Sequence, residues 1–290
     1  MGRNRTIERR KEREQERKRQ RQTAVLIGGV VIVVLAIVLL ILINQPQDAP
    51  ISEASSTRYA GLPQRTTDEG FLVIGSDDAP VQVVEYSSFD CTHCADFHET
   101  VTPTLIERVR AGEIQFTYVP MYGTGSITNG QGAALAAICA GEQGKFWEMH
   151  DALFSWQKLY ANTAFSANRL STGVSNLGLD AGAWNACVSS DAARQVTQAA
   201  VQAAQLQGIP GTPSVYVNGT VVASPDLNSV QTAIDQALST AGLPPAQIGD
   251  TTEATTEPAA EATSEATTEP AAEATSEPAA EATPEATPGS

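Results

Sequence analysis

Residues 81–98, VQVVEYSSFDCTHCADFH, contain the pattern that decides the fold. The first six residues are mostly β-branched or aromatic and follow a proline-containing turn, which predicts a buried strand. Two cysteines, Cys91 and Cys94, come shortly after this strand, and residues 95–110 then carry apolar side chains at helical spacing. The sequence therefore predicts a strand, a short turn and a helix that Pro103 should kink, with the cysteine pair at the start of the helix.

The rest of the folded part, residues 69–248, carries further strand and helix signals. A second strand is predicted over residues 114–119, and an alanine-rich stretch interrupted by glycines predicts an insertion of four or five helices at about 129–207. The turn Asn218-Gly219 between two short β-branched runs predicts a hairpin, which a closing helix follows. These signals predict an α/β fold in the order β-α-β, helical insertion, β-β-α, large enough to bury one core.

The Cys-x-x-Cys pair is the strongest candidate for chemistry. One helical turn separates the two residues, so their Cα atoms fall near the roughly 5.5 Å that a disulfide prefers. The unpaired N–H groups and the positive dipole end of a helix N-terminus stabilise a thiolate at Cys91, and a stable thiolate makes the disulfide a better oxidant. We expect Cys91 to be the nucleophile and the deeper Cys94 to resolve mixed disulfides. His93 would add a donor or a positive charge beside the Cys91 sulfur.

Zinc binding is the alternative use of these sulfurs. A structural zinc site needs four ligands. His98 is close to the pair in sequence, while His150, Cys139 and Cys187 lie in the predicted insertion. We predict no metal site, and we expect His98 and His150 to be helix-surface or core histidines.

Three motifs carry a resemblance to a known family. The runs EYSSFDCTHCADFH (85–98), GKFWEMHDALF (144–154) and GIPGTPSVYVNG (208–219) occur in this order and together resemble the DsbA-like thiol:disulfide oxidoreductases. The resemblance covers about residues 69–241. It implies a thioredoxin-like fold with an α-helical insertion, and a redox-active Cys91–Cys94 disulfide in place of any other cofactor.

The resemblance also implies roles for residues near the pair. Thr212 and Pro213 would form a cis-proline loop that packs against the disulfide and offers backbone hydrogen bonds to a substrate chain. Glu85 would be a buried acid with a raised pKa that serves as the base for Cys94. Thr92 stands where many relatives carry proline, a departure that bears on the redox potential.

Cys139 and Cys187 both lie in the predicted helical insertion. In an oxidising compartment a structural disulfide between them is the leading interpretation, and some members of the family that the chain resembles are bridged in this region. Closing a loop of this length contributes about 4 kcal/mol in the chain-entropy model. Two buried free thiols and a second redox relay are the alternatives.

The N-terminal region predicts a membrane anchor. Residues 24–43 form an uncharged, mostly apolar run that spans about 30 Å as a helix. Residues 1–22 hold ten Lys and Arg against four Glu, which predicts a cytoplasmic tail, a transmembrane helix over 23–44 and an extracytoplasmic remainder. A cleaved signal peptide is the alternative, but the run is long and no small-residue cleavage site follows closely. A basic arm that binds RNA is a second alternative for residues 1–22.

Two further segments are predicted to lack a fold of their own. Residues 45–68 are rich in proline and serine, which predicts a linker. Residues 249–290 repeat Glu, Thr, Pro and Ala without large apolar side chains, which predicts a disordered acidic tail. The formal net charge of −15 argues against a basic nucleic-acid-binding domain, so we expect no nucleic-acid partner.

These observations predict a single-pass cell-membrane protein with an extracytoplasmic catalytic domain. It would pass the Cys91–Cys94 disulfide to unfolded or reduced secreted proteins, and a membrane reoxidase of the DsbB or VKOR type would restore that disulfide. A disulfide reductase or isomerase is one alternative. A non-catalytic thioredoxin-fold chaperone or metal carrier is another.

Overall fold

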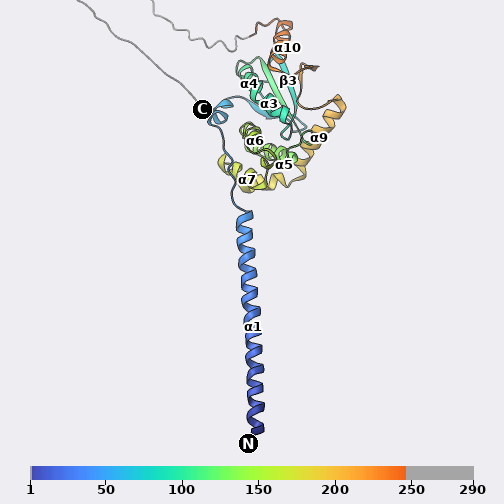
Figure 1. The fold of residues 1–290 in the computed structure, drawn as a ribbon. Coiled ribbons are helices and arrows are strands. Elements are labelled where there is room, and N and C mark those ends of the chain that lie inside the picture. The colour runs from blue at the N-terminus through green and yellow to red at the C-terminus, as the bar shows by residue number, and fades with distance from the viewer. Residues whose placement is uncertain (1, 246–290) are drawn as a thin grey trace, which may run out of the picture. The chain divides into compact units, whose positions relative to one another are not determined.

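The structure is a computed structural model that describes residues 2–245, with side chains from residue 13 onward (Figure 1). The predicted acidic tail, residues 249–290, and the basic side chains before residue 13 lie outside the described residues.

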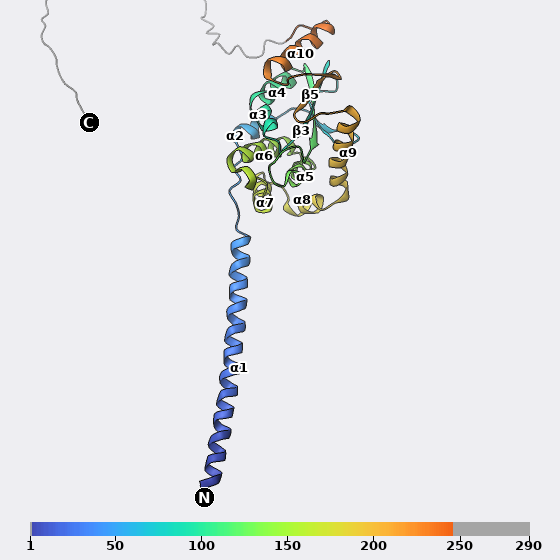
Figure 2. The ribbon, with the colours of Figure 1, turned by 45° about the vertical axis from the view of Figure 1, so that its right-hand side comes forward.

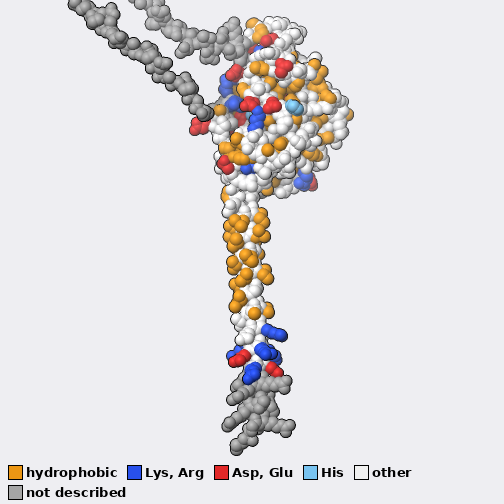
Figure 3. All heavy atoms as spheres, in the orientation of Figure 1, with side chains coloured by type: hydrophobic (Ala, Val, Ile, Leu, Met, Phe, Trp, Pro, Cys, Tyr) orange, Lys and Arg blue, Asp and Glu red, His pale blue; other side chains and the backbone are white. Residues whose placement is uncertain are grey.

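Helix α1, Gly2–Ile43, contains the predicted membrane span. Its part Arg13–Ile43 is long and apolar enough to cross a membrane, and none of the apolar window is buried against the rest of the chain. Figure 3 shows the apolar side chains as a band along the helix, with Lys and Arg side chains toward its N-terminal end. Such a fully exposed apolar surface is stable in a bilayer rather than in water, so α1 is consistent with a single-pass anchor.

A six-stranded sheet forms the centre of the described fold, in the order β1-β2-β4-β3-β5-β6. Its strands are β1 Gln64–Thr66, β2 Leu72–Ile74, β3 Val81–Ser88, β4 Ile114–Met121, β5 Ser214–Val217 and β6 Thr220–Val221. The long central strands β3 and β4 are parallel, and every other neighbouring pair is antiparallel. The sequence predicts β3, β4 and the β5–β6 hairpin. It does not predict β1 and β2, because three residues are too few for an alternating pattern.

Two helices connect β3 to β4, where the sequence predicts one kinked helix. They are α3, Thr92–Thr100, and α4, Thr102–Arg110. The chain breaks at Val101, and Pro103 occupies the first turn of α4. A proline in the first turn removes an N–H group that would have no partner within the helix, so it favours a new start over a kink.

The insertion between β4 and β5 contains five α-helices. They are α5 Gly130–Gly141, α6 Phe146–Tyr160, α7 Ala167–Asn176, α8 Ala181–Val188 and α9 Asp191–Gln207, with a short 3₁₀ turn at Ala161–Thr163. The last three begin at N-cap side chains of Ser166, Asp180 and Ser190, which accept N–H groups of the first turn. Figure 2 shows α7 and α8 at one end of the folded part and α10, Leu227–Thr240, at the other.

A disulfide joins two helices of the insertion. The sulfurs of Cys139 on α5 and Cys187 on α8 are bonded, with their Cα atoms 5.7 Å apart. The bond ties residues that are 48 positions apart in the sequence. In this structure the two residues are therefore neither free thiols nor ligands.

Residues 46–62, which we call the N-terminal strap, pack against the insertion. Ala49 and Tyr59 are only 1% and 2% exposed, and the strap contains helix α2, Glu53–Arg58. Side chains of α6 and α7 donate to consecutive strap carbonyls: Trp156 Nε1 to Pro50 (2.9 Å), Asn176 Nδ2 to Ala49 (2.8 Å) and Arg169 Nε to Asp48 (2.7 Å). Residues 45–68 therefore do not form the free linker that their composition indicates. The proline and serine content predicts that this segment lacks long helices and strands. It does not predict the donor side chains of α6 and α7 that bind the main chain of residues 48–50.

Candidate active site

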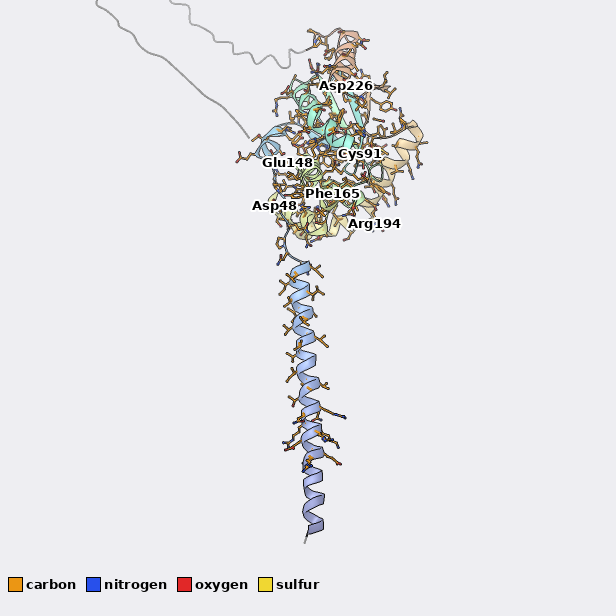
Figure 4. The ribbon with its side chains drawn as sticks, viewed as in Figure 1. Asp48, Cys91, Glu148, Phe165, Arg194 and Asp226 are labelled. Atoms are coloured by element: carbon orange, nitrogen blue, oxygen red, sulfur yellow. A yellow bond between two sulfur atoms is a disulfide. The ribbon has the colours of Figure 1, made fainter. Side chains whose placement is uncertain are left out.

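Cys91 lies at the start of α3 (Figure 4), and Cys94 follows in the first turn of the helix. Strand β3 ends at Ser88, whose carbonyl accepts the Cys91 N–H at 3.1 Å and closes a turn. Cys91 has extended backbone angles and is the N-cap residue of the helix, while Cys94 lies in its first turn. Both are unbonded thiols, with Cys91 5% exposed and Cys94 fully buried. Solvent and a partner molecule therefore reach Cys91 first.

The environment of Cys91 favours its thiolate. The pKa of Cys91 is lowered to about 5, and the largest cause is a hydrogen bond from the Cys94 thiol. Burial acts in the opposite direction, while Thr212 and the N–H groups of Cys94 and His93 lower the pKa further. N–H groups at a helix start stabilise negative charge. When the pair is reduced, Cys91 is therefore mainly a thiolate at neutral pH.

Cys94 is chemically the opposite of Cys91. Burial raises the pKa of Cys94 well above its ordinary value, and the neighbouring Cys91 and Glu85 raise it further. The pair thus combines one accessible sulfur that prefers the anion with one buried sulfur that prefers the neutral thiol. Such a pair can form a mixed disulfide at Cys91 and resolve it with Cys94.

Glu85 is a buried carboxyl group of β3 close to both cysteines. It is 1% exposed, and burial raises its pKa to about 8, with Ser87 lowering the pKa and Cys91 raising it. Its Oε2 atom has no hydrogen-bond partner among the described residues. Glu85 is therefore mainly protonated at neutral pH, and its predicted role as the base for Cys94 remains a prediction.

Thr212 directly precedes Pro213 and strand β5, and it lies beside Cys91. Antiparallel pairing of β3 and β5 sets Tyr86 opposite Ser214, so the residues before β5 reach the end of β3. The Thr212–Pro213 peptide bond is cis, and the Cys91 thiol donates to the Thr212 carbonyl at 3.3 Å. The main chain of Thr212 therefore lies directly beside the accessible sulfur.

Thr92 and His93 occupy the first two positions of α3, and both are exposed. The backbone N–H of His93 donates a hydrogen bond to the Cys91 sulfur and lowers the pKa of Cys91. The predicted contribution of the His93 imidazole remains a prediction.

Asp90, directly before Cys91, is a site residue that the motif analysis does not identify. It is 3% exposed, and its carboxylate accepts the N–H groups of Gly123 (2.7 Å) and Gly125 (3.0 Å) and the Ser88 hydroxyl. These bonds fasten residues 122–129, which we call the β4–α5 loop, to the active-site turn. The alternating glycines of this loop are the only sequence signal that points to such a close contact.

Gln157 on α6 is a second residue without a motif. Its side chain is buried, and its amide donates to the main-chain oxygens of Phe89 and Cys91. A residue of the helical insertion thus holds the turn that carries the cysteines. No periodicity predicts this, because the contact joins residues 66 positions apart.

His98 and His150 meet in the core beside Asp151. His98 Nε2 and His150 Nδ1 each lie 3.5 Å from Asp151 Oδ1. Burial lowers the pKa of His98 to about 3 and also lowers the pKa of His150, so both rings are neutral at neutral pH. Arg58 of the strap pairs with Asp151 at 2.9 Å, and the Tyr59 hydroxyl donates to the same carboxylate. The cluster therefore joins α3, α6 and the strap.

The same cluster is the candidate metal site of the described residues. The ligand-type atoms of His98, His150 and Asp151 all lie within 4.8 Å of one another. However, Arg58 already neutralises Asp151, so a divalent cation would add an uncompensated charge to a buried site. The cysteines that the zinc alternative would need, Cys139 and Cys187, are bonded to each other. The geometry favours a structural network.

Sequence comparisons place this site in a family. The family model described as thioredoxin matches residues 67–236. A probable disulfide bond formation protein D of Bacillus anthracis is 31% identical over 168 residues, which cover 57% of this chain and 77% of that protein. A putative protein-disulfide oxidoreductase of Rickettsia conorii is 28% identical over 174 residues, covering 59% of this chain and 61% of that protein.

Solved structures share the fold. Oxidised BdbD from Bacillus subtilis aligns with a TM-score of 0.54 at 23% identity, covering 60% of this chain and 96% of that chain. MdbA, a thiol-disulfide oxidoreductase from Corynebacterium matruchotii, aligns with a TM-score of 0.52 at 16% identity, covering 61% and 95%. The matched family model, the sequence relatives and the common fold confirm the predicted thioredoxin-like fold with a helical insertion. The chain belongs to the thioredoxin family and, within it, to the DsbA-like thiol:disulfide oxidoreductases.

Proposed function

We propose that this thiol:disulfide oxidoreductase works as a dithiol oxidase, with Cys91 and Cys94 as its redox pair. The observation that carries the proposal is the environment of Cys91 at the N-cap of α3, which lowers the pKa of its thiol to about 5. A stabilised thiolate favours the reduced pair, so the Cys91–Cys94 disulfide readily accepts electrons from other thiols. Enzymes of this family use such a disulfide rather than a bound cofactor.

The proposed reaction proceeds in two exchange steps. A thiolate of the client protein attacks Cys91 in the Cys91–Cys94 disulfide, which forms a mixed disulfide and releases Cys94 as a thiolate. Protonated Glu85 would give its proton to Cys94, whose pKa is strongly raised. A second client thiolate then attacks the client sulfur of the mixed disulfide, and Cys91 leaves as a stable thiolate. The client gains one disulfide, and two electrons remain on the cysteine pair.

Members of the family act on substrate proteins and need a partner that reoxidises them. We propose unfolded or reduced secreted proteins as the clients of this chain. A membrane reoxidase of the DsbB or VKOR type would remove the two electrons. The acidic chain gives no support to a nucleic-acid partner.

We also propose an extracytoplasmic position for the catalytic domain, with α1 as the anchor and the basic N-terminus in the cytoplasm. The basic residues before the apolar run support this orientation. The Cys139–Cys187 disulfide supports it independently, because structural disulfides persist in oxidising compartments. Labelling of Cys91 by a membrane-impermeant thiol reagent in intact, mildly reduced cells tests the orientation, and labelling only after lysis would contradict it.

A redox titration of the full-length protein in detergent tests the oxidase assignment. We expect a reduction potential nearer to the roughly −120 mV of strong oxidants than to the roughly −270 mV of reductants. Alkylation trapping in cells should find the pair mostly oxidised, and a Cys91→Ser variant should lose all activity. A low potential with a mostly reduced pair would indicate a reductase or isomerase. Full activity of the Cys91→Ser variant would indicate a non-catalytic chaperone or carrier.

A further inference from the structure

The β4–α5 loop is fixed on both sides of one exposed threonine. The N–H groups of Gly123 and Gly125 donate to the two carboxylate oxygens of Asp90, at 2.7 Å and 3.0 Å. The Ile127 N–H donates to the Asp90 carbonyl at 3.3 Å. Thr124 lies between the two anchored glycines and is exposed. Its backbone position is therefore set by the residue that immediately precedes Cys91.

The loop also lies in direct contact with the active-site main chain. A Cβ atom added at Gly125 would fall 1.8 Å from the Asp90 carbonyl oxygen and 2.6 Å from the Cys91 Cα. No side chain fits in this space, so glycine is required for the loop to approach so closely. A Cβ at Gly130 would likewise fall 2.0 Å from the Asp90 carboxylate. The β4–α5 loop therefore packs directly against the active-site turn and forms part of the site.

Thr124 reaches from this loop to the cis-proline loop. The hydroxyl groups of Thr124 and Thr212 are 2.7 Å apart, a hydrogen-bond distance between residues 88 positions apart in sequence. On its other side the Thr212 carbonyl oxygen lies 3.3 Å from the Cys91 sulfur. The side chain of Thr124 therefore fixes Thr212 beside the reactive sulfur.

From these contacts we infer that Thr124 is a specificity-determining positioning residue that orients Thr212 for binding an extended polypeptide beside Cys91. The inference rests on the proposed oxidase function and deepens it. In the Cys91–Cys94 disulfide and in the mixed disulfide, Cys91 carries no thiol hydrogen, so the Thr212 carbonyl is free to pair with the main chain of the client. A Thr212 side chain already fixed by Thr124 has less freedom to lose when the client binds. Thr124 itself forms and breaks no covalent bond.

The composition of the two loops indicates which polypeptides fit. Residues 122–129 and residues 208–213 contain no charged side chain. Recognition at this place therefore depends on main-chain hydrogen bonds, hydroxyl groups and small apolar contacts, and not on the charge of the client. The partner is an extended cysteine-containing segment without a required charge pattern, as in an unfolded chain.

A pair of conservative substitutions tests the role of Thr124 in the full-length protein in detergent. Thr124→Val keeps the shape and removes the hydroxyl, whereas Thr124→Ser keeps the hydroxyl. Pre-oxidised protein is mixed with an excess of an unstructured peptide that contains two cysteines, or of dithiothreitol, which has no main chain to bind, and the single-turnover oxidation rate is measured over a range of substrate concentrations. We expect Thr124→Val to lower the second-order rate constant for the peptide by about fivefold, mainly by raising the half-saturating peptide concentration, which matches the loss of one neutral hydrogen bond. Dithiothreitol oxidation should stay within about twofold, and Thr124→Ser should restore the peptide rate.

Thr128→Val is the matched control, because Thr128 is an exposed threonine of the same loop and no hydrogen bond of its hydroxyl is described. It should leave both rates unchanged. Equal peptide rates for Thr124→Val and wild type would overturn the inference. A loss of the same size on peptide and dithiothreitol would also overturn it, since the residue would then act on the cysteine pair. A wild-type protein that oxidises neither substrate would refute the oxidase function and this inference together, and the wild-type control alone reveals that outcome.

Discussion

The side-chain amide of Gln157 donates a hydrogen bond of 3.1 Å to the carbonyl oxygen of Cys91. The same amide donates to the Phe89 carbonyl, so one buried side chain of α6 holds two main-chain oxygens of the active-site turn. Carbonyl groups that are buried without a donor are costly. The helical insertion therefore supports the cysteine turn directly, in addition to covering the sheet.

Replacing Gln157 with leucine should destabilise the fold by about 1–3 kcal/mol, because the buried Phe89 carbonyl loses its donor and the Cys91 carbonyl keeps only the Ala95 N–H. Denaturant unfolding at neutral pH measures the change. Gln205→Leu on the exposed face of α9 is the control and should stay within about 0.5 kcal/mol. If both variants unfold at the same denaturant concentration, the hydrogen bonds of Gln157 do not support the turn.

The Glu85→Gln variant should gain stability relative to wild type as the pH rises from about 4.5 to about 8. Burial raises the pKa of Glu85 to about 8, so in this range the unfolded chain releases a proton that the folded protein keeps, and wild-type stability falls with rising pH. The amide does not titrate and lacks this loss. Unfolding of both reduced proteins at several pH values gives the difference, in which the titration of Cys91 largely cancels. The same variant should resolve mixed disulfides more slowly. A difference that is independent of pH would show that Glu85 is ionised in the fold.

Titration of the reduced protein by thiolate ultraviolet absorbance should give a midpoint near pH 5 for Cys91. A lowered folded-state pKa contributes stability that is complete above the ordinary thiol pKa of about 8.5 and is lost as the pH falls through about 5. The reduced protein should therefore melt at a higher temperature than the oxidised protein at pH 8, with the gap closing toward pH 4. Cys94→Ala removes the largest cause of the low pKa and should move the midpoint upward. An unchanged midpoint in that variant would assign the low pKa to Thr212 and the N–H groups at the helix start.

A fragment of residues 63–245 should be less stable than a fragment of residues 45–245 by at least about 3 kcal/mol. The shorter fragment loses the burial of Ala49 and Tyr59 against the insertion. Denaturant unfolding of the two purified fragments compares them. Tyr59→Phe in the longer fragment is a milder test, since it removes only the hydroxyl that donates to Asp151, and should cost about 1–3 kcal/mol. Two fragments of equal stability would mean that the strap binds the domain without supporting it.

Local patterns in the sequence determine the helix start at Cys91, the strands β3 and β4, the closing hairpin and the apolar span of α1. Each of these features follows from one continuous stretch of sequence: β-branched runs, a Cys-x-x-Cys spacing, an Asn-Gly turn and an uncharged run long enough to cross a bilayer. The chemistry of the sulfur pair follows from the same short range, because the N–H groups that stabilise Cys91 belong to the first turn of its own helix.

Only the tertiary structure decides which distant side chains complete the site. Asp90 binds Gly123, Gln157 binds the Cys91 carbonyl, and Thr124 meets Thr212 across 33, 66 and 88 residues of chain, respectively. The strap likewise binds donors that lie more than a hundred positions away. A hydrogen bond between a side chain and a main-chain group that is distant in sequence leaves no periodic pattern or motif in the sequence. It becomes visible only when the sheet and the insertion have brought both partners within 3 Å or so of each other.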